Sequence, residues 1–280
     1  MNDPKLCIIG GSPRSGTRNF ADLISAHPDT QLFGEVGHYA LPKVKGALEE
    51  MAAYHAEETS RRTLRGRGRQ KKFASHRVAL TLTGMYAKSP QMPFNFNALT
   101  SRHVVGFKTP QIEKRWRLMN ELYGEFENER HFFFCIRNLD QNFLSLHSRG
   151  WRKDVEEYVE RLLPLLQSIV KFKAWNESKD GGWQIHLLHL NAFLDAASRE
   201  DWLFDRVYRP LFGGDARQPA AQALASTSNR NSTLNVTGKP ARSELTDEEQ
   251  NFLTNSAELK EAVERFNAAF NTDLPILTPK

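Results

Sequence analysis

Short apolar runs and stretches of helical periodicity alternate along most of the chain, beginning at the N-terminus. Residues 6–9 form an apolar run with β-branched side chains, which is typical of a buried strand, and two glycines end it. Over residues 17–24 the apolar positions recur at helical spacing. Pro28 ends this helix at His27, because proline disfavours a helical conformation for the residue before it. The N-terminal segment is therefore predicted to be a strand, a glycine-rich loop and a helix.

The same alternation continues along the chain. Further apolar runs of strand length lie at residues 30–33, 102–108, 130–137 and 183–190. The run that begins at Arg130 is apolar enough for a central strand covered on both faces. Helical periodicity separates most of these runs. The pattern predicts an α/β fold, namely a P-loop-like three-layer domain whose central, mainly parallel sheet is flanked by helices.

Two segments depart from this alternation. Residues 40–100 are predicted to be an insertion over the edge of the sheet, where specificity elements tend to lie. Residues 213–243 are predicted to be a long polar loop, and a loop of this length in a compact domain is usually functional or disordered. Thr246 then opens a capping box for the last helix. No repeat or linker divides the chain, so residues 1–280 are predicted to form a single domain.

Composition indicates which class of protein and which cellular compartment to expect. The chain has 280 residues, of which 40% are hydrophobic and 25% charged, as in ordinary globular proteins. No run approaches the length of a membrane span, and the first residues lack the layout of a signal peptide. Cys7 and Cys135 each lie inside an apolar run and are predicted to be buried, reduced thiols. These features favour a cytoplasmic protein without a membrane span.

The charge is unevenly distributed. The net charge is +5, and residues 61–72 contain seven cations and no acidic residue. This basic run is either a solvated face or a landing surface for an acidic acceptor. No aromatic residues alternate with its cations as on a base-stacking platform, so nucleic acid is not expected as a partner.

The glycine-rich loop has the chemistry of an anion site. It reads Gly-Ser-Pro-Arg-Ser-Gly-Thr over residues 11–17, and the helix behind it directs free N–H groups and its dipole into the loop. Arg14 adds a full positive charge. A Walker A loop has lysine after its second glycine, whereas this chain has Thr17 there. The loop is therefore poorly equipped for a nucleoside triphosphate with magnesium, but it suits a phosphate-like group of lower charge. A tight turn without a ligand is the alternative.

Further polar residues fall at predicted strand ends, where parallel α/β sheets bind their ligands. Glu35 and His38 follow the second strand and are candidates for proton transfer. Arg137 ends the fourth strand, and Ser145 lies two turns along the next helix, so the pair is able to clamp a second phosphate. The alternative roles are a surface acid for Glu35, a hydrogen-bonded histidine for His38 and a structural ion pair for Arg137. No cluster has the spacing of metal ligands, so no metal is predicted.

In this order and combination, the segments resemble the sulfotransferases that use 3′-phosphoadenosine 5′-phosphosulfate (PAPS). Residues 13–17, Pro-Arg-Ser-Gly-Thr, are similar to the family's 5′-phosphosulfate loop. Arg137 followed eight positions later by Ser145 is similar to its 3′-phosphate pair, and residues 213–243 resemble the loop that closes on the cofactor. The resemblance implies cofactor contacts from Pro13, Arg14, Ser15, Gly16, Thr17, Arg18, Arg137, Ser145, Lys239 and Arg242.

Two segments are nearest the branch that includes heparan sulfate sulfotransferases and their bacterial relatives. They are residues 16–38, which contain Gly-Thr-Arg, Ser-Ala-His-Pro-Asp and Glu-Val-Gly-His, and the Lys-Thr-Pro sequence at Lys108. In that branch a glutamate at the position of Glu35 is the base, and the lysine lies beside the acceptor. The resemblance implies catalytic roles for Glu35, Arg14, His38 and Lys108.

The chain departs from the family pattern at three positions. Arg14 replaces the more familiar lysine, and guanidinium does not give up its proton, which argues against protonation of the leaving group by this residue. One extra residue separates Glu35 from His38, which weakens the assignment of His38. Phe107 replaces the glutamate before Lys108, which weakens the carry-over of a glycosaminoglycan acceptor.

The predicted function is sulfuryl transfer from PAPS to a hydroxyl or amine of a small-molecule, lipid or carbohydrate acceptor, with 3′-phosphoadenosine 5′-phosphate (PAP) as product. One alternative is a nucleotide or small-molecule kinase, which predicts a Walker lysine and a magnesium-binding aspartate at a strand end. Another is a non-catalytic anion-binding module that holds an acidic polymer on the basic run.

Overall fold

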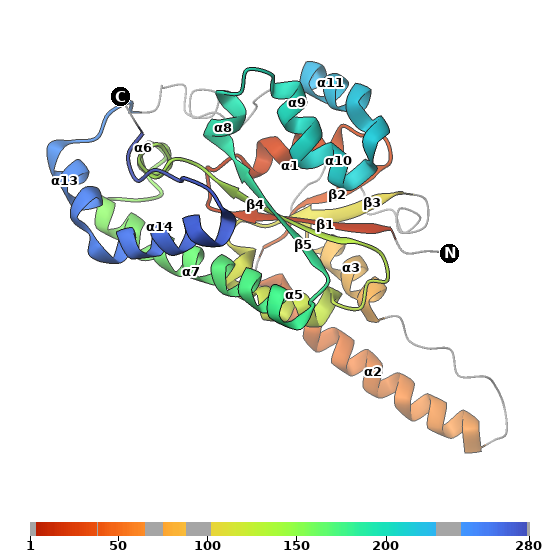
Figure 1. Cartoon of the computed structure of the whole chain (residues 1–280). Coiled ribbons are helices and arrows are strands. Elements are labelled where there is room, and N and C mark those ends of the chain that lie inside the picture. Colours follow the sequence, from red (N-terminus) through yellow and green to blue (C-terminus); the bar gives the residue numbers. More distant parts are fainter. Residues whose placement is uncertain (1–3, 38, 65–74, 88–101, 228–241, 279–280) are drawn as a thin grey trace.

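The computed structural model describes residues 4–37, 39–64, 75–87, 102–227 and 242–278 of the chain. A sheet of five parallel strands in the order β2-β3-β1-β4-β5 lies at its centre (Figure 1). The strands are β1 (Lys5–Gly11), β2 (Thr30–Glu35), β3 (Val104–Lys108), β4 (Arg130–Ile136) and β5 (Trp183–His189). The predicted α/β fold with a parallel sheet between helices is confirmed.

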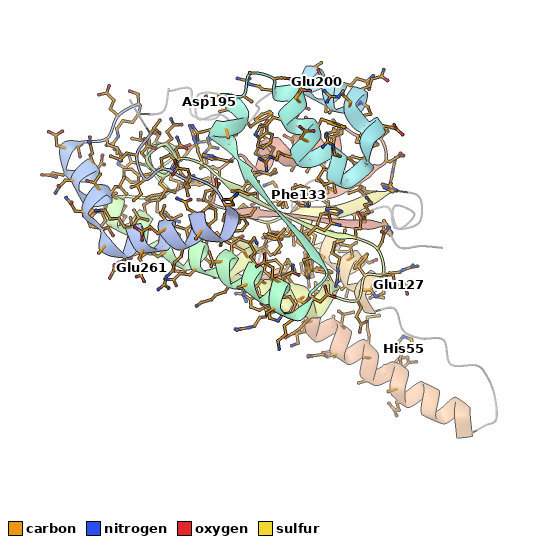
Figure 2. All side chains as sticks on the ribbon, in the orientation of Figure 1. His55, Glu127, Phe133, Asp195, Glu200 and Glu261 are labelled. Atoms are coloured by element: carbon orange, nitrogen blue, oxygen red, sulfur yellow. The ribbon has the colours of Figure 1, made fainter. Side chains whose placement is uncertain are left out.

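Helices cover both faces of the sheet, as the alternation of side chains along each strand requires. In β1, Leu6 and Ile8 enter one hydrophobic core, whereas Cys7 and Ile9 enter the other. Figure 2 shows Phe133 of the central sheet enclosed between the layers, with Glu200 and Glu261 at the periphery. Both cysteines are buried free thiols, and burial raises the pKa of each.

The two layers of helices differ in length. One face carries short helices, namely α1 (Thr17–Ser25), α8 (Leu190–Leu194), α9 (Arg199–Leu203), α10 (Arg209–Phe212) and α11 (Arg217–Ser226). The other helices are α2 (Ala40–Leu64), α3 (Ser75–Met85), α5 (Trp116–Tyr123), α6 (Leu139–His147), α7 (Val155–Lys179), α13 (Asp247–Asn255) and α14 (Ala257–Phe270). Single turns complete the chain at Ile112–Arg115, Phe204–Tyr208 and Gly214–Ala216. Among the described helices, none is both long and apolar enough to cross a membrane.

The register places the glycine-rich loop between two other strand ends. Ile9 of β1 lies opposite Lys108 of β3, and Gly11 lies opposite Cys135 of β4. Because all strands are parallel, their carboxyl ends meet at one edge of the sheet. The loop therefore leaves the central strand at the same edge as Lys108 and Arg137, as the sequence predicts.

Residues 40–100 contain α2 and α3, whose inner residues join the core of one face. Beyond residue 50, α2 runs away from the rest of the chain, and residues 51–57 are exposed (Figure 1). Residues 65–72 of the basic run lie outside the described residues. The role of this segment in acceptor specificity stays a prediction.

Local signals near the C-terminus were less reliable. The predicted loop at residues 213–243 contains α11, because Ala216, Ala220 and Ala223 pack into the core and stabilise a helix of weak amphipathicity. Residues 228–241 of this segment lie outside the described part of the chain. The single helix predicted after Thr246 is two helices, since Ser256 leaves helical geometry and caps the second. The capping box at Thr246 is confirmed.

Candidate functional site

The glycine-rich loop depends on backbone conformations that favour glycine. Gly11 has φ 119° and Gly16 has φ 88°, both in the region where a Cβ atom is unfavourable. A Cβ atom on Gly11 would lie 2.0 Å from the carbonyl oxygen of Cys135. Arg14, at the tip of the loop, has φ 68°. The tight turn thus allows β1 to end against β4 and still direct the loop back over the sheet.

Buried polar groups hold the loop from beneath. The single hydroxyl proton of Ser15 is shared between the carbonyl oxygens of Ser12 at 2.5 Å and Cys135 at 2.8 Å. Asn142 of α6 donates its side-chain amide to the Pro13 carbonyl at 2.9 Å and accepts from the Ser12 hydroxyl at 2.9 Å. The loop is therefore preorganised by α6, which the sequence reading missed. Because the Ser15 hydroxyl donates into the protein, a role for Ser15 in cofactor binding stays a prediction.

The loop leads directly into the start of α1. Gly16 occupies the N-cap position, and no described side chain caps the helix. Thr17 is buried at the first helical position. The Arg18 side chain is exposed and lies along the helix, where its Nε is 3.1 Å from the Asp22 carboxylate. The helix start therefore presents backbone N–H groups to the loop, whereas Arg18 is engaged on the surface.

The loop arginine meets the second predicted anion site. Arg14 Nε donates to the Ser145 hydroxyl of α6 at 3.1 Å, although the two residues are 131 positions apart. The pKa of Arg14 is lowered to about 10, mainly by burial and also by the nearby guanidinium groups of Arg149 and Arg137. Three arginines thus lie close enough to repel one another, which is a typical feature of an anion site. Arg149 was not identified from the sequence.

Arg137 stands at the carboxyl end of β4, on the same edge. Its Nη2 donates to the Gln141 side chain at 3.0 Å, and its Nε is buried without a hydrogen-bond partner among the described residues. Burial lowers the pKa of Arg137, and the charge of Asp140 opposes that shift. Arg137, Ser145 and Arg14 therefore form one cluster at the ends of β1 and β4.

The candidate base pairs with the predicted lysine. Glu35 ends β2 and forms an ion pair with Lys108, which ends the adjacent strand β3. The lysine side chain is 7% exposed, whereas that of Glu35 is 44% exposed and so accessible to an acceptor. Thr109 donates its hydroxyl to the Val36 carbonyl at 2.7 Å and joins the two strand ends. The other candidate base, His38, lies outside the described residues.

A buried acid supports the loop from the opposite side. Glu113 accepts the Gly11 N–H at 3.0 Å, and its other carboxylate oxygen has no hydrogen-bond partner in the described part of the chain. Burial raises the pKa of Glu113 to about 7, opposed by its backbone hydrogen bonds and by the charge of Lys114. Nothing in the local sequence marks this residue, because it reaches the loop only through the packing of Ile112–Arg115 against β1.

Of the two predicted residues near the C-terminus, only Arg242 is described. Its backbone N–H donates to Ser148 at 2.9 Å, and its guanidinium pairs with Glu249 and lies 5.8 Å from the ring centroid of Phe143. Arg242 therefore returns to the region of α6 that carries Ser145. Lys239 lies outside the described residues. Within the same described ranges, no group of three His, Cys, Asp or Glu side chains is placed to hold a metal ion.

No family model and no curated protein matches the chain. Among solved structures, it is similar to a sulfotransferase from Alicyclobacillus acidocaldarius, with 12% identity, a TM-score of 0.48 and 98% of each chain covered. It is also similar to a sulfotransferase from Mycobacterium tuberculosis H37Rv, with 13% identity, a TM-score of 0.45, and coverage of 96% of this chain and 77% of that one. At these TM-scores, neither likeness carries an argument about activity.

Proposed function

We propose that the protein is a sulfotransferase that uses PAPS to sulfate a hydroxyl or amine of a small-molecule, lipid or carbohydrate acceptor. The observation that carries this proposal is the contact between Arg14 of the glycine-rich loop and Ser145 of α6, beside Arg137. PAPS has two anionic groups, a 5′-phosphosulfate and a 3′-phosphate. The two clusters that the sequence assigns to them are adjacent, as one nucleotide requires.

The residues fit these two groups by their chemistry. The backbone of residues 13–17, the start of α1 and Arg14 would hold the phosphosulfate, because N–H groups and a guanidinium bind anionic oxygens. Arg137 and Ser145 would hold the 3′-phosphate, with Arg242 nearby. The loop has no Walker lysine, which disfavours nucleoside triphosphates.

The proposed reaction is an in-line transfer of the sulfuryl group that PAPS supplies. Glu35 takes the proton from the acceptor hydroxyl or amine while the acceptor atom bonds to sulfur and the bond to the nucleotide phosphate oxygen breaks. The nucleotide leaves with that electron pair, so its charge grows beside the loop N–H groups and Arg14. Lys108 positions Glu35 through their ion pair. By analogy with phosphoryl transfer, positioning and charge stabilisation provide most of the catalysis.

The decisive experiment measures transfer of labelled sulfate from PAPS to a panel of phenol, alcohol, amine and sugar acceptors. We expect activity in excess EDTA and no ATP hydrolysis. Magnesium-dependent ATP turnover would instead support a kinase. Absence of PAP binding in a calorimetric titration would support a non-catalytic module that holds an acidic polymer on the basic run.

A further inference from the structure

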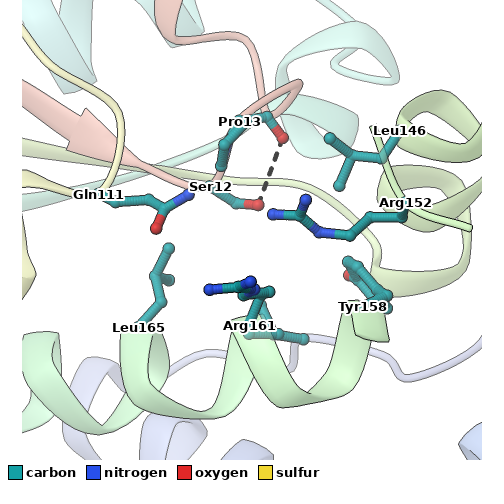
Figure 3. A pocket seen from close by; sticks show the side chains of 9 residues that line it. Ser12, Pro13, Gln111, Leu146, Arg152, Tyr158, Arg161 and Leu165 are labelled. Atoms are coloured by element: carbon teal, nitrogen blue, oxygen red, sulfur yellow. Dashed lines mark hydrogen bonds between the residues drawn. The ribbon is translucent and has the colours of Figure 1, made fainter. Parts of the chain in front are cut away.

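A second group of cations lies next to the glycine-rich loop. A pocket opens there beside Ser12 and Pro13, and α7 supplies much of its opposite wall (Figure 3). Figure 3 shows the side chains of Arg152 and Arg161 extending into the same space, Arg152 from the right beside Ser12 and Arg161 from the helix below. None of the nine described residues that line the pocket is acidic. The pocket thus presents two guanidinium groups to whatever enters it.

A third cation lies next to these two. Lys114 Nζ donates to the Gln111 side chain at 2.9 Å and to the Arg161 carbonyl at 3.2 Å. Burial lowers the pKa of Lys114, the charge of Glu113 opposes this shift, and the charges of Arg161 and Arg152 lower the pKa further. Arg152 and Arg161 therefore lie close enough to repel the charge on Lys114, and an anion bound among these side chains would relieve that repulsion.

The neighbouring carboxylates neutralise this cluster only in part. Arg152 Nη1 is 3.7 Å from Glu157 Oε1, and Arg152 Nε is buried without a hydrogen-bond partner among the described residues. The guanidinium of Arg161 makes no hydrogen bond or ion pair within the described part of the chain. Glu113 is fully buried and accepts a hydrogen bond from the backbone N–H of Gly11. The cluster consequently keeps donors for a ligand.

The shape of the pocket limits what enters. Its enclosed space is about 10 Å³, which is room for about one water molecule. Only about one oxygen atom of an anionic end group fits there, while the rest of the group and of its molecule lies outside. Leu162 and Leu165 line the pocket and exclude water, which strengthens the attraction between an arginine and an anionic oxygen. A planar carboxylate and a tetrahedral sulfate or phosphate group each carry negatively charged oxygens that accept hydrogen bonds from guanidinium groups.

We propose that the pocket between the loop and α7 binds an anionic end group of the acceptor, so that the protein selects acidic acceptors. This inference rests on the proposed function, because it treats Arg14 and Arg137 as the sites of the cofactor's own anions. The pocket shares Ser12 and Pro13 with the loop. An acceptor anchored here would therefore lie beside the transferred group.

Calorimetry with a matched pair of probes tests the proposal. The probes are 4-hydroxyphenylacetate and its neutral amide, titrated into the full chain with and without saturating PAP. We expect the carboxylate to bind at least about tenfold more tightly than the amide, through charge-assisted hydrogen bonds. Arg161→Gln and Arg152→Gln should each abolish most of this preference, and Arg161→Lys should retain part of it. Arg265→Gln, which removes an exposed arginine on α14, is the control and should change nothing.

The outcomes separate this inference from the proposed function. Equal binding of the two probes, or binding of neither, would overturn the pocket as an acceptor site. Competition between PAP and the carboxylate, with weaker PAP binding in Arg161→Gln, would assign the pocket to the cofactor and overturn the inference too. A chain that binds the carboxylate but not PAP would support the pocket and contradict the proposed cofactor.

Discussion

The amino-terminal and carboxyl-terminal edges of the sheet differ in how their charged side chains are paired. At the amino edge Lys5 Nζ is 2.7 Å from Glu129, which is 3.1 Å from His131 Nε2, and His131 Nδ1 is 3.1 Å from His186. Burial lowers the pKa of both histidines to about 4, so they are neutral near pH 7. Lys5 therefore has a carboxylate partner at this edge, whereas Arg130 donates to the carbonyl oxygens of Gly124 and Gly181 and its Nε has no hydrogen-bond partner among the described residues.

At the carboxyl edge cations outnumber the acids that face them. Burial and the charges of Arg149 and Arg137 lower the pKa of Arg14 in the loop, and a second cationic cluster of Lys114, Arg152 and Arg161 lies nearby. Glu35 and Lys108 form a matched ion pair at this edge. Edges of the same sheet, with the same strands, thus differ in electrostatic balance. The carboxyl-edge cations gather beside the glycine-rich loop, where the proposed function places the anions of the nucleotide, whereas Lys5 at the amino edge already has a carboxylate partner.

Removing the proposed base should have the largest effect on the carboxyl edge. Glu35→Gln keeps the shape of the side chain and removes its basicity, so the turnover rate at saturating substrate should fall by about 10²–10⁴-fold. PAP affinity, measured by calorimetry, should change little because a carboxylate does not help to bind an anion. His38→Ala is the matched comparison. Near-normal turnover in Glu35→Gln with loss in His38→Ala would reassign the base.

Removing one arginine of the anion cluster should have the next largest effect. Arg137→Ala should weaken PAP binding by about 2–4 kcal/mol, as expected when one partner of a desolvated charge-assisted contact is removed. Adenosine 5′-phosphosulfate, which lacks the 3′-phosphate, should bind almost as before. Calorimetry with both ligands measures the difference. Equal losses for the two nucleotides would contradict the assignment of Arg137 to the 3′-phosphate.

The buried acid beneath the loop should make stability depend on pH. The pKa of Glu113 rises from an ordinary 4.5 to about 7 on folding, so between these values the folded chain binds the proton and the unfolded chain does not. Its contribution to stability is therefore complete below the lower pKa and is lost as pH rises toward the higher one. The change is about 3 kcal/mol over that window. Urea denaturation from pH 4 to 8 should show a flatter profile for Glu113→Gln, and an unchanged profile would refute this role.

The smallest effect is expected from breaking the ion pair between Lys5 and Glu129 at the amino edge. Hydrogen bonding to Lys5 lowers the pKa of Glu129, whose side chain is 44% exposed. Because partly exposed ion pairs contribute little, Glu129→Gln should cost less than about 1 kcal/mol in urea denaturation at pH 7. Since the folded pKa is depressed, the stabilising effect of the carboxylate should fade as pH falls through that pKa. PAP binding should be unaffected, and a loss of binding would remove the distinction between the two edges.

The sequence by itself determined the elements whose signals are local. The strand, loop and helix around Gly11 to Thr17 follow from apolar periodicity and glycine positions, and the structure places them as predicted. The meeting of Arg14 with Ser145 was also predictable in outline, because the carboxyl ends of parallel strands share one edge whatever their order. The same reasoning brought Glu35 and Lys108 to that edge.

Tertiary structure alone decided the contacts that join distant segments. Glu113 reaches Gly11 across 102 positions, and Asn142 holds the loop from another helix, yet neither residue has a local signature. The cluster of Lys114, Arg152 and Arg161 arises because α7 packs against Ile112–Arg115 and beside the loop. The local pattern of apolar and polar residues predicts whether a side chain faces the core. The balance of charge at a site depends instead on which segments pack together. For that reason the sequence predicted the anion loop, and only the packed chain revealed the second cationic pocket.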